Sequence, residues 1–472
     1  MQYKKTKPEN KILLLLDKIK DFGDNNLPSW IISRRRVLIF IIIDIFISIS
    51  ISLIYKSNLN VFLASILLVW ILFSYISHRY KVEKFQNIKR IKYKRKSLKN
   101  TFFAFSLTFF YIISVTYFVK DYIILNNQLY LNYKFYSYTI IVISLSFISL
   151  LCQYLLRKIL SFYDTKDYKL LYYGSEETLN KIKFYSSENN LSIKYIKVDS
   201  LKKVLKNNPK FQGLIIEDLK EISKIDLQDL KFIDTKVNQI LTIFSWCETF
   251  LEKFPTNLLT NEYVLSRNYF RISNLKEYKL KRIGDICLSM ILLIFTLPII
   301  ALASIAIYIE DRGPIFYSQI RSGYLQKPFK IIKLRTMCID SEKDGLKWST
   351  KNDKRITKVG IFLRLMRIDE LPQLISVLKG EMSLIGPRPE RPEIDKYLIE
   401  KIPYYELRYS VRPGLSGWAQ VNYPYGASEK DAEEKLSYDI FYLANFSFLL
   451  DLGIMFKTIK LVLNMRGAIA KH

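Results

Sequence analysis

The hydrophobic residues in the first third of this chain form four long runs, which are separated by polar segments. Each run is close to the roughly 20 residues that a membrane-spanning helix needs. The runs cover residues 37–55, 59–76, 102–119 and 135–156. This pattern predicts a transmembrane four-helix bundle over residues 37–157, which follows a polar N-terminal segment over residues 1–36.

Basic residues flank these runs unequally. Lysine and arginine are concentrated at residues 34–36, 89–99 and 157–158, whereas the other two connections carry little charge. Because basic loops stay on the cytoplasmic side, we expect the N-terminal segment and everything after residue 157 to be cytoplasmic. Asp44 lies inside the first run. A carboxylate there is either functional or a structural contact to a helix or a lipid headgroup, and we favour the structural contact.

The middle of the chain has a different pattern. Short β-rich runs alternate with polar stretches that suit helices. The runs cover residues 169–173, 191–198, 213–216 and 239–244. The alternation predicts a cytoplasmic Rossmann-like α/β domain over residues 164–275.

The first of these runs ends in Gly174-Ser175-Glu176-Glu177, at the position of a dinucleotide-binding loop. The second and third glycines of that fingerprint are missing. We therefore favour a degenerate nucleotide-like or sensory fold over a cofactor site.

A fifth apolar run covers residues 286–309 and contains Pro298 near its middle. It is long enough to cross a membrane. One interpretation is an ordinary fifth span, and the other is a re-entrant helix that bends at Pro298 and returns to the cytoplasmic side. A full crossing would place residues 312–472 outside, away from nucleotide-activated substrates. The chemistry of the segments that follow favours the re-entrant helix.

The charge of the chain narrows the class of partner. Lys and Arg number 72 against 44 Asp and Glu, which gives a net charge of +28. This excess suits nucleic acid, an anionic membrane face or phosphorylated substrates. We expect no nucleic acid partner, because no such signature is present and the basic residues flank apolar runs. With only two histidines, catalysis should fall to carboxylates, arginine, lysine or tyrosine.

Two adjacent carboxylates, Asp369 and Glu370, lie in the part of the chain that is densest in motifs. One carboxylate can attack phosphorus, and its neighbour can hold Mg²⁺. Arg364 and Arg367 are three residues apart, on one face of a helix that leads into this pair. Arginines beside a nucleophilic carboxylate keep it ionised and compensate the charge of a phosphoryl intermediate.

Further basic residues lie on either side of this pair in the sequence. Lys333 and Arg335 alternate with apolar residues, so that a strand would place both on one face. Pro387 and Pro389 flank Arg388 and restrict where its guanidinium points. We therefore consider all three basic residues as candidate phosphate-binding groups.

The last part of the chain adds an acidic residue and an apolar helix. Asp439 is a further acid, after a Gly/Pro-rich loop over residues 411–422. Residues 446–463 have apolar positions on one side and three charges interspersed. This helix either lies at the membrane surface or packs as an ordinary amphipathic helix.

These motifs, as a set, closely resemble the bacterial sugar transferase family, the polyprenyl-phosphate hexose-1-phosphate transferases that start surface-polysaccharide assembly. The resemblance covers about residues 279–468. The residues that carry it are Lys281-Arg282 with Asp285, Gly313-Pro314, Gln319-Ile320-Arg321-Ser322-Gly323, Lys333-Leu334-Arg335-Thr336-Met337, Asp369-Glu370-Leu371-Pro372-Gln373, Gly386-Pro387-Arg388-Pro389, Pro413-Gly414 with Gly417-Trp418-Ala419-Gln420-Val421, and Tyr438-Asp439. The four N-terminal runs and the α/β domain look like the long form of the family, by architecture more than by motif.

The resemblance implies a reaction and a role for each motif. A UDP-hexose would give its sugar-1-phosphate to undecaprenyl phosphate at the cytoplasmic membrane face and release UMP, as the first membrane step of exopolysaccharide, capsule or O-antigen biosynthesis. Asp369 would form a covalent phosphosugar intermediate and Glu370 would hold Mg²⁺. The loop of Pro387, Arg388 and Pro389 would contact the uridine.

The resemblance also assigns the remaining candidates. Arg364 and Arg367 would bind phosphate oxygens, and Lys333 and Arg335 would lie nearby. Asp439 would be a second acid at the site. The re-entrant helix broken at Pro298 is a family feature, and it would open a mostly helical catalytic domain over residues 279–472 with interfacial helices.

Two other functions stay open beside the transferase. A non-catalytic scaffold or regulator of polysaccharide assembly would keep the fold but not need the carboxylates. A phosphatase-type hydrolase would pass through the same intermediate with water as the acceptor. We expect an α/β membrane protein of the bacterial inner membrane, with membrane lipids as partners. The identity of the hexose, a homo-oligomeric state and a ligand of residues 164–275 remain open.

Overall fold

The computed structural model describes residues 29–54, 61–77, 79–80, 100–115, 128–164, 168–198, 213–217, 240–266, 269, 276–339, 353, 355–423, 426 and 428–463. The chain divides into two compact units, Met1–Leu251 and Glu252–His472. Most of the predicted segment 1–36 and the basic loop 89–99 lie outside the described residues.

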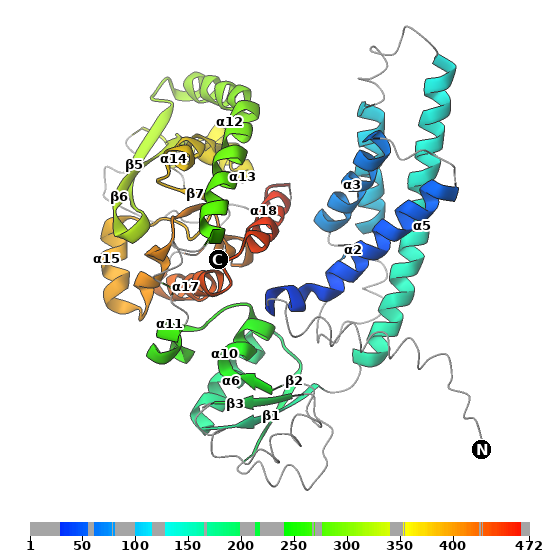
Figure 1. The fold of residues 1–472 in the computed structure, drawn as a ribbon. Helices are drawn as coiled ribbons and strands as arrows, with labels where there is room; N and C mark the ends of the chain where they lie inside the picture. Colours follow the sequence, from blue (N-terminus) through cyan, green and yellow to red (C-terminus); the bar gives the residue numbers. More distant parts are fainter. Residues whose placement is uncertain are drawn as a thin grey trace, which may run out of the picture. The chain divides into compact units, whose positions relative to one another are not determined.

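Four helices come first in the N-terminal unit, at the positions of the four apolar runs (Figure 1). They are α2 (Ser29–Ile54), α3 (Val61–Ile76), a helix over Asn100–Val115, and α5 (Gln128–Asp164). Two helices of the described residues are long and apolar enough to cross a membrane: Tyr138–Leu156 within α5, and Lys276–Asp311 in the second unit. The other three N-terminal helices have shorter apolar stretches.

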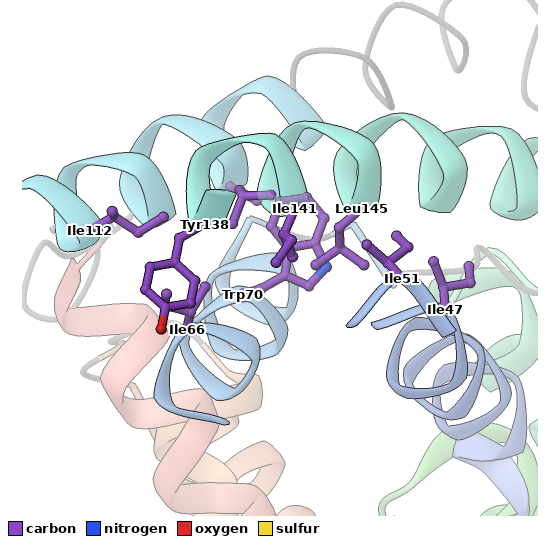
Figure 2. Packing of buried hydrophobic residues seen from close by; sticks show 10 residues of the cluster. Ile47, Ile51, Ile66, Trp70, Ile112, Tyr138, Ile141 and Leu145 are labelled. Carbon is purple, nitrogen blue, oxygen red and sulfur yellow. The ribbon is translucent and has the colours of Figure 1, made fainter. Parts of the chain in front are cut away.

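The four helices pack around one hydrophobic cluster, part of which Figure 2 shows. Its buried residues are Ile47 and Ile51 from α2, Ile66 and Trp70 from α3, Ala104 and Ile112 from the helix over Asn100–Val115, and Tyr138, Ile141, Val142 and Leu145 from α5. The outer faces are also apolar: Phe46 is 72% exposed and Phe147 is 70% exposed. Large exposed apolar faces of this kind fit a lipid environment better than water.

An α/β layer follows in the same unit. Its parallel sheet has the strand order β2-β1-β3-β4. The elements are β1 (Tyr168–Tyr173), α6 (Glu176–Glu188), β2 (Ile193–Lys197), β3 (Gly213–Ile216), β4 (Ile240–Thr242), α10 (Ile243–Trp246) and the π-helix η1 (Cys247–Leu251). The four strands lie where the β-rich runs predicted them. The last run was expected to continue to residue 244, but Thr242 caps α10 through its side chain and ends the strand.

The second unit begins earlier than the expected boundary at residues 275–279. Residues 252–266 were assigned to the α/β domain, yet they pack within the second unit. The Phe254 N–H donates to the Ser437 carbonyl at 2.9 Å, and Phe254 contacts the ring of Phe441. The indole N–H of Trp418 donates to the Glu252 carbonyl at 3.0 Å. Burial of these aromatic side chains accounts for the earlier boundary.

Helices dominate the second unit. Its strands form an antiparallel pair, β5 (Phe316–Ser322) with β6 (Pro328–Leu334), and a parallel pair, β7 (Ser383–Ile385) with β8 (Gly414–Ser416). The helices are η2 (Thr256–Leu258), α11 (Asn261–Ser266), α12 (Lys276–Asp311), η4 (Tyr324–Gln326), α13 (Lys358–Met366), η5 (Ile368–Gln373), α14 (Leu374–Lys379), α15 (Pro392–Lys401), η6 (Tyr405–Ser410), α16 (Trp418–Asn422), α17 (Glu429–Ala444) and α18 (Phe448–Leu463).

Helix α12 contains Pro298 and changes direction along its length (Figure 1). A straight helix of this size would be about 54 Å long, but both of its ends contact the same unit. Arg282 donates to the carbonyls of Val377 and Leu378 at 2.6 and 2.9 Å, while Ala303 and Ile307 pack against a cluster that includes Leu334 and Leu363. Most side chains between these contacts are exposed and apolar. Both ends of α12 therefore pack within one unit, and the re-entrant course of this helix stays a prediction.

Candidate functional site

The two carboxylates Asp369 and Glu370 lie in a short 3-10 helix, η5, directly after α13. Arg367 ends α13 in the left-handed conformation, with φ of 56°, a conformation that costs a residue with a Cβ about 1–2 kcal/mol. This residue turns the chain sharply between the two helices. Both carboxylates are buried, with exposed fractions of 9% and 8%. The turn thus presents two acids in a protected position.

The start of α13 is also fixed. Thr357 caps it through a side-chain contact to the N–H of Gly360, and the Glu310 carboxylate accepts from the N–H of Lys358 at 2.8 Å. A Cβ on Gly360 would lie 2.2 Å from the Thr336 carbonyl oxygen. Helix α13 therefore lies directly against the end of β6, and Arg364 at its other end donates to Thr336 Oγ1 at 2.8 Å.

Three cationic side chains face Glu370. Its Oε1 lies 2.8 Å from Arg388 Nη2 and 3.7 Å from Lys333 Nζ, and its Oε2 lies 4.0 Å from Arg367 Nη1. Burial alone would raise the pKa of Glu370, but the positive charges of Arg388, Lys333 and Arg367 hold it well below its usual range. Glu370 is thus ionised at neutral pH.

Asp369 differs from its neighbour. Burial and the negative charge of Glu370 raise the pKa of Asp369, against the opposing effect of Lys333, Arg364 and Arg388. Burial also lowers the pKa of Lys333 to about 8, although Glu370 opposes that change. Two adjacent acids with divergent pKa values in a cationic, buried setting are typical of a catalytic site.

The structure brings four of the predicted basic residues to this pair: Lys333 from β6, Arg364 and Arg367 from α13, and Arg388 from the loop between β7 and α15. Arg388 is the most accessible of the ion-paired ones, with a side chain 35% exposed. Its neighbours Pro387 and Pro389 lie in the same loop. Four basic side chains thus lie close to the two carboxylates.

Two other predicted residues lie elsewhere. Strand β6 ends at Leu334, so the alternation that was expected to align Arg335 with Lys333 stops there, and Arg335 forms an ion pair with Asp311 at the end of α12. Asp439 lies in α17 and pairs with Arg408, whose Nη2 is 3.2 Å from Asp439 Oδ2. Burial raises the pKa of Asp439 to about 6, in spite of Arg408.

Sequence reasoning missed Arg408. Its side chain is 7% exposed, and it connects Asp439 to the backbone carbonyl of Arg388 at 2.8 Å. In the sequence it is one basic residue in the mixed segment Tyr405-Glu406-Leu407-Arg408-Tyr409-Ser410. Only its burial and long-range partners distinguish it from the other arginines of the chain.

Glu370 and Asp369 are the residues of this site that could hold a magnesium ion. Among the described residues, no group of three or more His, Cys, Asp or Glu side chains could hold a metal. Magnesium is, however, commonly bound through one or two carboxylates plus substrate phosphate oxygens and waters. The buried, ionised Glu370 beside Asp369 fits that mode, so a metal that arrives with a diphosphate is compatible with these residues.

The glycine loop of the α/β layer is contacted by a carboxylate of the protein itself. Glu217, after β3, accepts from the Ser175 N–H at 2.5 Å, from Thr178 Oγ1 at 2.7 Å and from the Tyr172 hydroxyl at 2.7 Å. These donors lie at the start of α6, where a dinucleotide phosphate would be bound. The Glu217 side chain takes that position, which agrees with the expectation of a degenerate loop.

Comparison with known proteins gives a consistent result. The model of the family described as bacterial sugar transferase matches residues 276–465. Over 189 residues, the chain is 43% identical to the UDP-N-acetylgalactosamine-undecaprenyl-phosphate N-acetylgalactosaminephosphotransferase of Aeromonas hydrophila, a match that covers 40% of this chain and 45% of the relative. Over 190 residues, it is 39% identical to the UDP-glucose:undecaprenyl-phosphate glucose-1-phosphate transferase of Caulobacter vibrioides. This match covers 40% of this chain and 71% of the relative.

A third relative is shorter. The uncharacterized sugar transferase EpsL of Bacillus subtilis is 38% identical over 192 residues, which cover 40% of this chain and 89% of that protein. The chain spans less than half the length of the first curated relatives that it matches. The family model includes the part of the chain that carries Asp369, Glu370 and Arg388.

Proposed function

The chain belongs to the bacterial sugar transferase family, and on that premise we propose that it transfers a hexose-1-phosphate from a UDP-sugar to undecaprenyl phosphate, through a covalent intermediate on Asp369. The observation that carries the proposal is the buried pair Asp369 and Glu370 inside a cluster of four cations. A cluster of cationic side chains suits a diphosphate, which carries two negative charges in a nucleotide sugar.

The first half of the reaction uses Asp369 as the nucleophile. One carboxylate oxygen attacks the phosphorus that bears the sugar, and the phosphoanhydride bond to UMP breaks. UMP leaves with the electron pair of that bond, and the sugar-1-phosphate stays on Asp369 as an acyl phosphate. Lys333, Arg364 and Arg367 stabilise the charge that spreads over the phosphoryl oxygens.

The second half regenerates the enzyme. A phosphate oxygen of undecaprenyl phosphate attacks the same phosphorus, and the bond to the Asp369 oxygen breaks. The product is a lipid-linked diphosphate sugar, and Asp369 returns as a carboxylate. Such a product is the starting unit of a lipid-linked exopolysaccharide, capsule or O-antigen chain, and two successive displacements give ping-pong kinetics.

Arg388 would contact the nucleotide part of the donor. Its side chain is partly exposed, and its loop is fixed on both sides by proline. Asp439 is too deeply buried to meet the substrate, with an exposed fraction of 1%, so we assign it to support of Arg408. Glu370 would hold a magnesium ion, which would supply charge neutralisation on the diphosphate.

We place the protein in the bacterial inner membrane with its catalytic unit on the cytoplasmic face. The four N-terminal helices would form the transmembrane bundle ahead of a Rossmann-like layer, and α12 would enter and leave the membrane on one side. The exposed apolar residues of α12 support this arrangement: Phe295 is 73% exposed and Leu302 is 69% exposed. Residue 312 onward then stays on the side of the UDP-sugar pool.

The test is UMP release by the full chain in detergent or lipid particles, with Mg²⁺, undecaprenyl phosphate and a panel of UDP-glucose, UDP-galactose and their N-acetylated forms. Asp369→Asn should abolish the release, and the exposed Glu393→Gln serves as the matched carboxylate control. Lipid-dependent release that Asp369→Asn eliminates and Glu393→Gln does not affect supports the transferase.

Two other outcomes would reject it. Release of free sugar phosphate without lipid would identify a hydrolase, in which water takes the place of the acceptor. If well-folded protein turned over none of the UDP-sugars, the result would favour a non-catalytic scaffold instead.

A further inference from the structure

The loop that carries Arg388 is held through its carbonyl oxygens. The carbonyls of Pro387, Arg388, Pro389 and Glu390 accept hydrogen bonds from Gly414 N, Arg408 Nη2, Arg321 Nη1 and Ser322 N, at 2.8, 2.8, 3.3 and 2.9 Å respectively. The carbonyl oxygens of four successive residues thus each accept from a different donor. Because the two prolines have no N–H to offer, this loop depends on donors from other elements to keep its conformation.

Two of those donors are arginine side chains, and Arg408 is the more deeply buried. It comes from η6 and reaches the carbonyl of Arg388 itself. Its Nη1 donates to the Tyr405 hydroxyl at 2.5 Å, and its guanidinium lies 5.0 Å from the centre of that ring. Asp439 supplies the counter-charge. The guanidinium is therefore fixed by a carboxylate, a hydroxyl and a carbonyl at once.

A buried ion pair of this kind is a poor source of stability. Removal of two charges from water costs several kcal/mol per ion, and an apolar pair of similar volume would often pack as well. The guanidinium has a property that an apolar side chain lacks, because its planar fork can donate to several acceptors in fixed directions. The acceptor that links it to the candidate site is the Arg388 carbonyl.

We propose that Arg408, with Asp439 as its counter-charge, is the positioning residue for Arg388. By holding the Arg388 carbonyl, it sets the direction in which the Arg388 side chain leaves the loop, and that side chain then meets Glu370 at 2.8 Å. The clamp itself rests on these contacts. Its consequence for the donor nucleotide rests on the proposed function.

Arg408→Lys tests the clamp with little change of charge. Lysine still pairs with Asp439, but its single nitrogen cannot reach all the acceptors of the guanidinium. Hydrogen exchange of the peptide that contains residues 384–391 should become faster. The matched control is Arg282→Lys, which weakens another arginine-to-carbonyl contact, at Val377 and Leu378. That control should affect residues 377–380 and leave 384–391 unchanged.

A double-mutant cycle tests whether Arg408 acts through Arg388. We expect Arg408→Lys to lower kcat/KM for the UDP-sugar about tenfold, mainly through KM, because the change weakens a hydrogen bond that a charged group donates. In an Arg388→Ala background, the same change should cost less than about twofold. Tyr405→Phe, which removes one acceptor of Arg408, should give a smaller effect in the same direction and serves if Arg408→Lys does not fold.

Each result decides the proposal. Unchanged exchange of residues 384–391 overturns the clamp, whether or not the protein is active. Faster exchange with additive kinetic effects overturns the link to Arg388 and leaves only a general packing role. If the wild type transfers no sugar phosphate, the proposed function fails separately, and the exchange measurement still decides the clamp.

Discussion

Replacement of Glu370 by glutamine tests how the cations of the candidate site are balanced. Glutamine keeps the shape of the side chain and removes its negative charge, which faces Arg388, Lys333 and Arg367. The arginines keep their protons throughout the accessible pH range. Asp369, whose pKa is raised to about 6, also responds but titrates at a lower pH, so Lys333 is the group whose protonation responds near pH 8.

The size of the response follows from one distance. Lys333 Nζ lies 3.7 Å from Glu370 Oε1, and both side chains are mostly buried. At an effective dielectric constant of about 20, a charge pair at about 4 Å is worth roughly 4 kcal/mol, or about 3 pKa units. Solvent and neighbouring charges reduce this value, so we expect a decrease of at least about one unit. The pKa of Lys333, which is about 8 in the wild type, would then fall to about 7 or below in Glu370→Gln.

The sign of the pH effect follows from proton binding. An unfolded lysine has a pKa of about 10.4, so Lys333 binds its proton more weakly in the folded protein than in the unfolded chain. Stability therefore rises with pH from the folded pKa upward. That rise begins near pH 8 in the wild type and at a lower pH in the variant. The stability difference between them should shrink by about 1.4 kcal/mol per pH unit between the two pKa values and stay constant above.

The assay is equilibrium unfolding of both proteins from about pH 6.5 to about pH 9, a range above the titration of ordinary carboxylates. Lys333→Met provides the control, because the effect of Glu370→Gln in that background should not depend on pH above the titration of Asp369. A stability difference that is constant between pH 6.5 and 8 in the presence of Lys333 would refute the reasoning.

Three further predictions concern other parts of the same unit. Burial and Glu370 raise the pKa of Asp369, so single-turnover UMP release should decline on acidification at a pH above the ordinary aspartate value of about 4; a decline only near 4 would contradict this. Gly360→Ala places a Cβ 2.2 Å from the Thr336 carbonyl oxygen and should cost about 1–3 kcal/mol in unfolding experiments, whereas an unchanged unfolding midpoint would show that α13 moves freely. Lys281→Met removes the partner of the buried Asp451 at 2.6 Å and should cost up to about 3–5 kcal/mol; the added substitution Asp451→Leu should recover part of that loss.

The elements of this chain were predictable where a pattern is local. Apolar runs marked the helices of the N-terminal unit, and four β-rich runs marked the four parallel strands. The carboxylate pair and Arg388 were found from the sequence because each lies in a short, characteristic motif. The distance of 2.8 Å between Arg388 Nη2 and Glu370 Oε1 could not be predicted from the sequence. It depends on how η5 and the loop after β7 pack together.

Partners that lie far apart in the sequence could not be predicted from local sequence patterns. Arg335 was assigned to the phosphate group from strand alternation, but β6 ends one residue before it and Asp311, 24 residues away, is its partner. Glu217 follows Gly174 by more than 40 residues, and nothing in its own surroundings indicates that it would fill the glycine loop. Arg408 is similar, since its partners Arg388 and Asp439 lie 20 and 31 residues away.

Asp44, the acidic residue inside the first apolar run, has several partners in the structure. The carboxylate is fully buried and accepts from Trp70 Nε1 at 3.3 Å, Arg79 Nη1 at 2.9 Å, Tyr80 OH at 2.7 Å and Gln153 Nε2 at 3.4 Å. This contact between helices agrees with the structural role that was favoured for it. A fully paired intramembrane carboxylate is less costly than an isolated one.

The partners of Asp44 come from different apolar runs of the chain. Asp44 lies close to the middle of the first apolar run, Arg79 follows the second, and Gln153 is near the end of the fourth. Arg79 also donates to Thr101 Oγ1 at 3.2 Å, at the beginning of the third. The network thus joins the end of the second run, the beginning of the third and the end of the fourth, as expected if these helices alternate in direction. The buried ion pair of Asp44 and Arg79 connects them to the first helix.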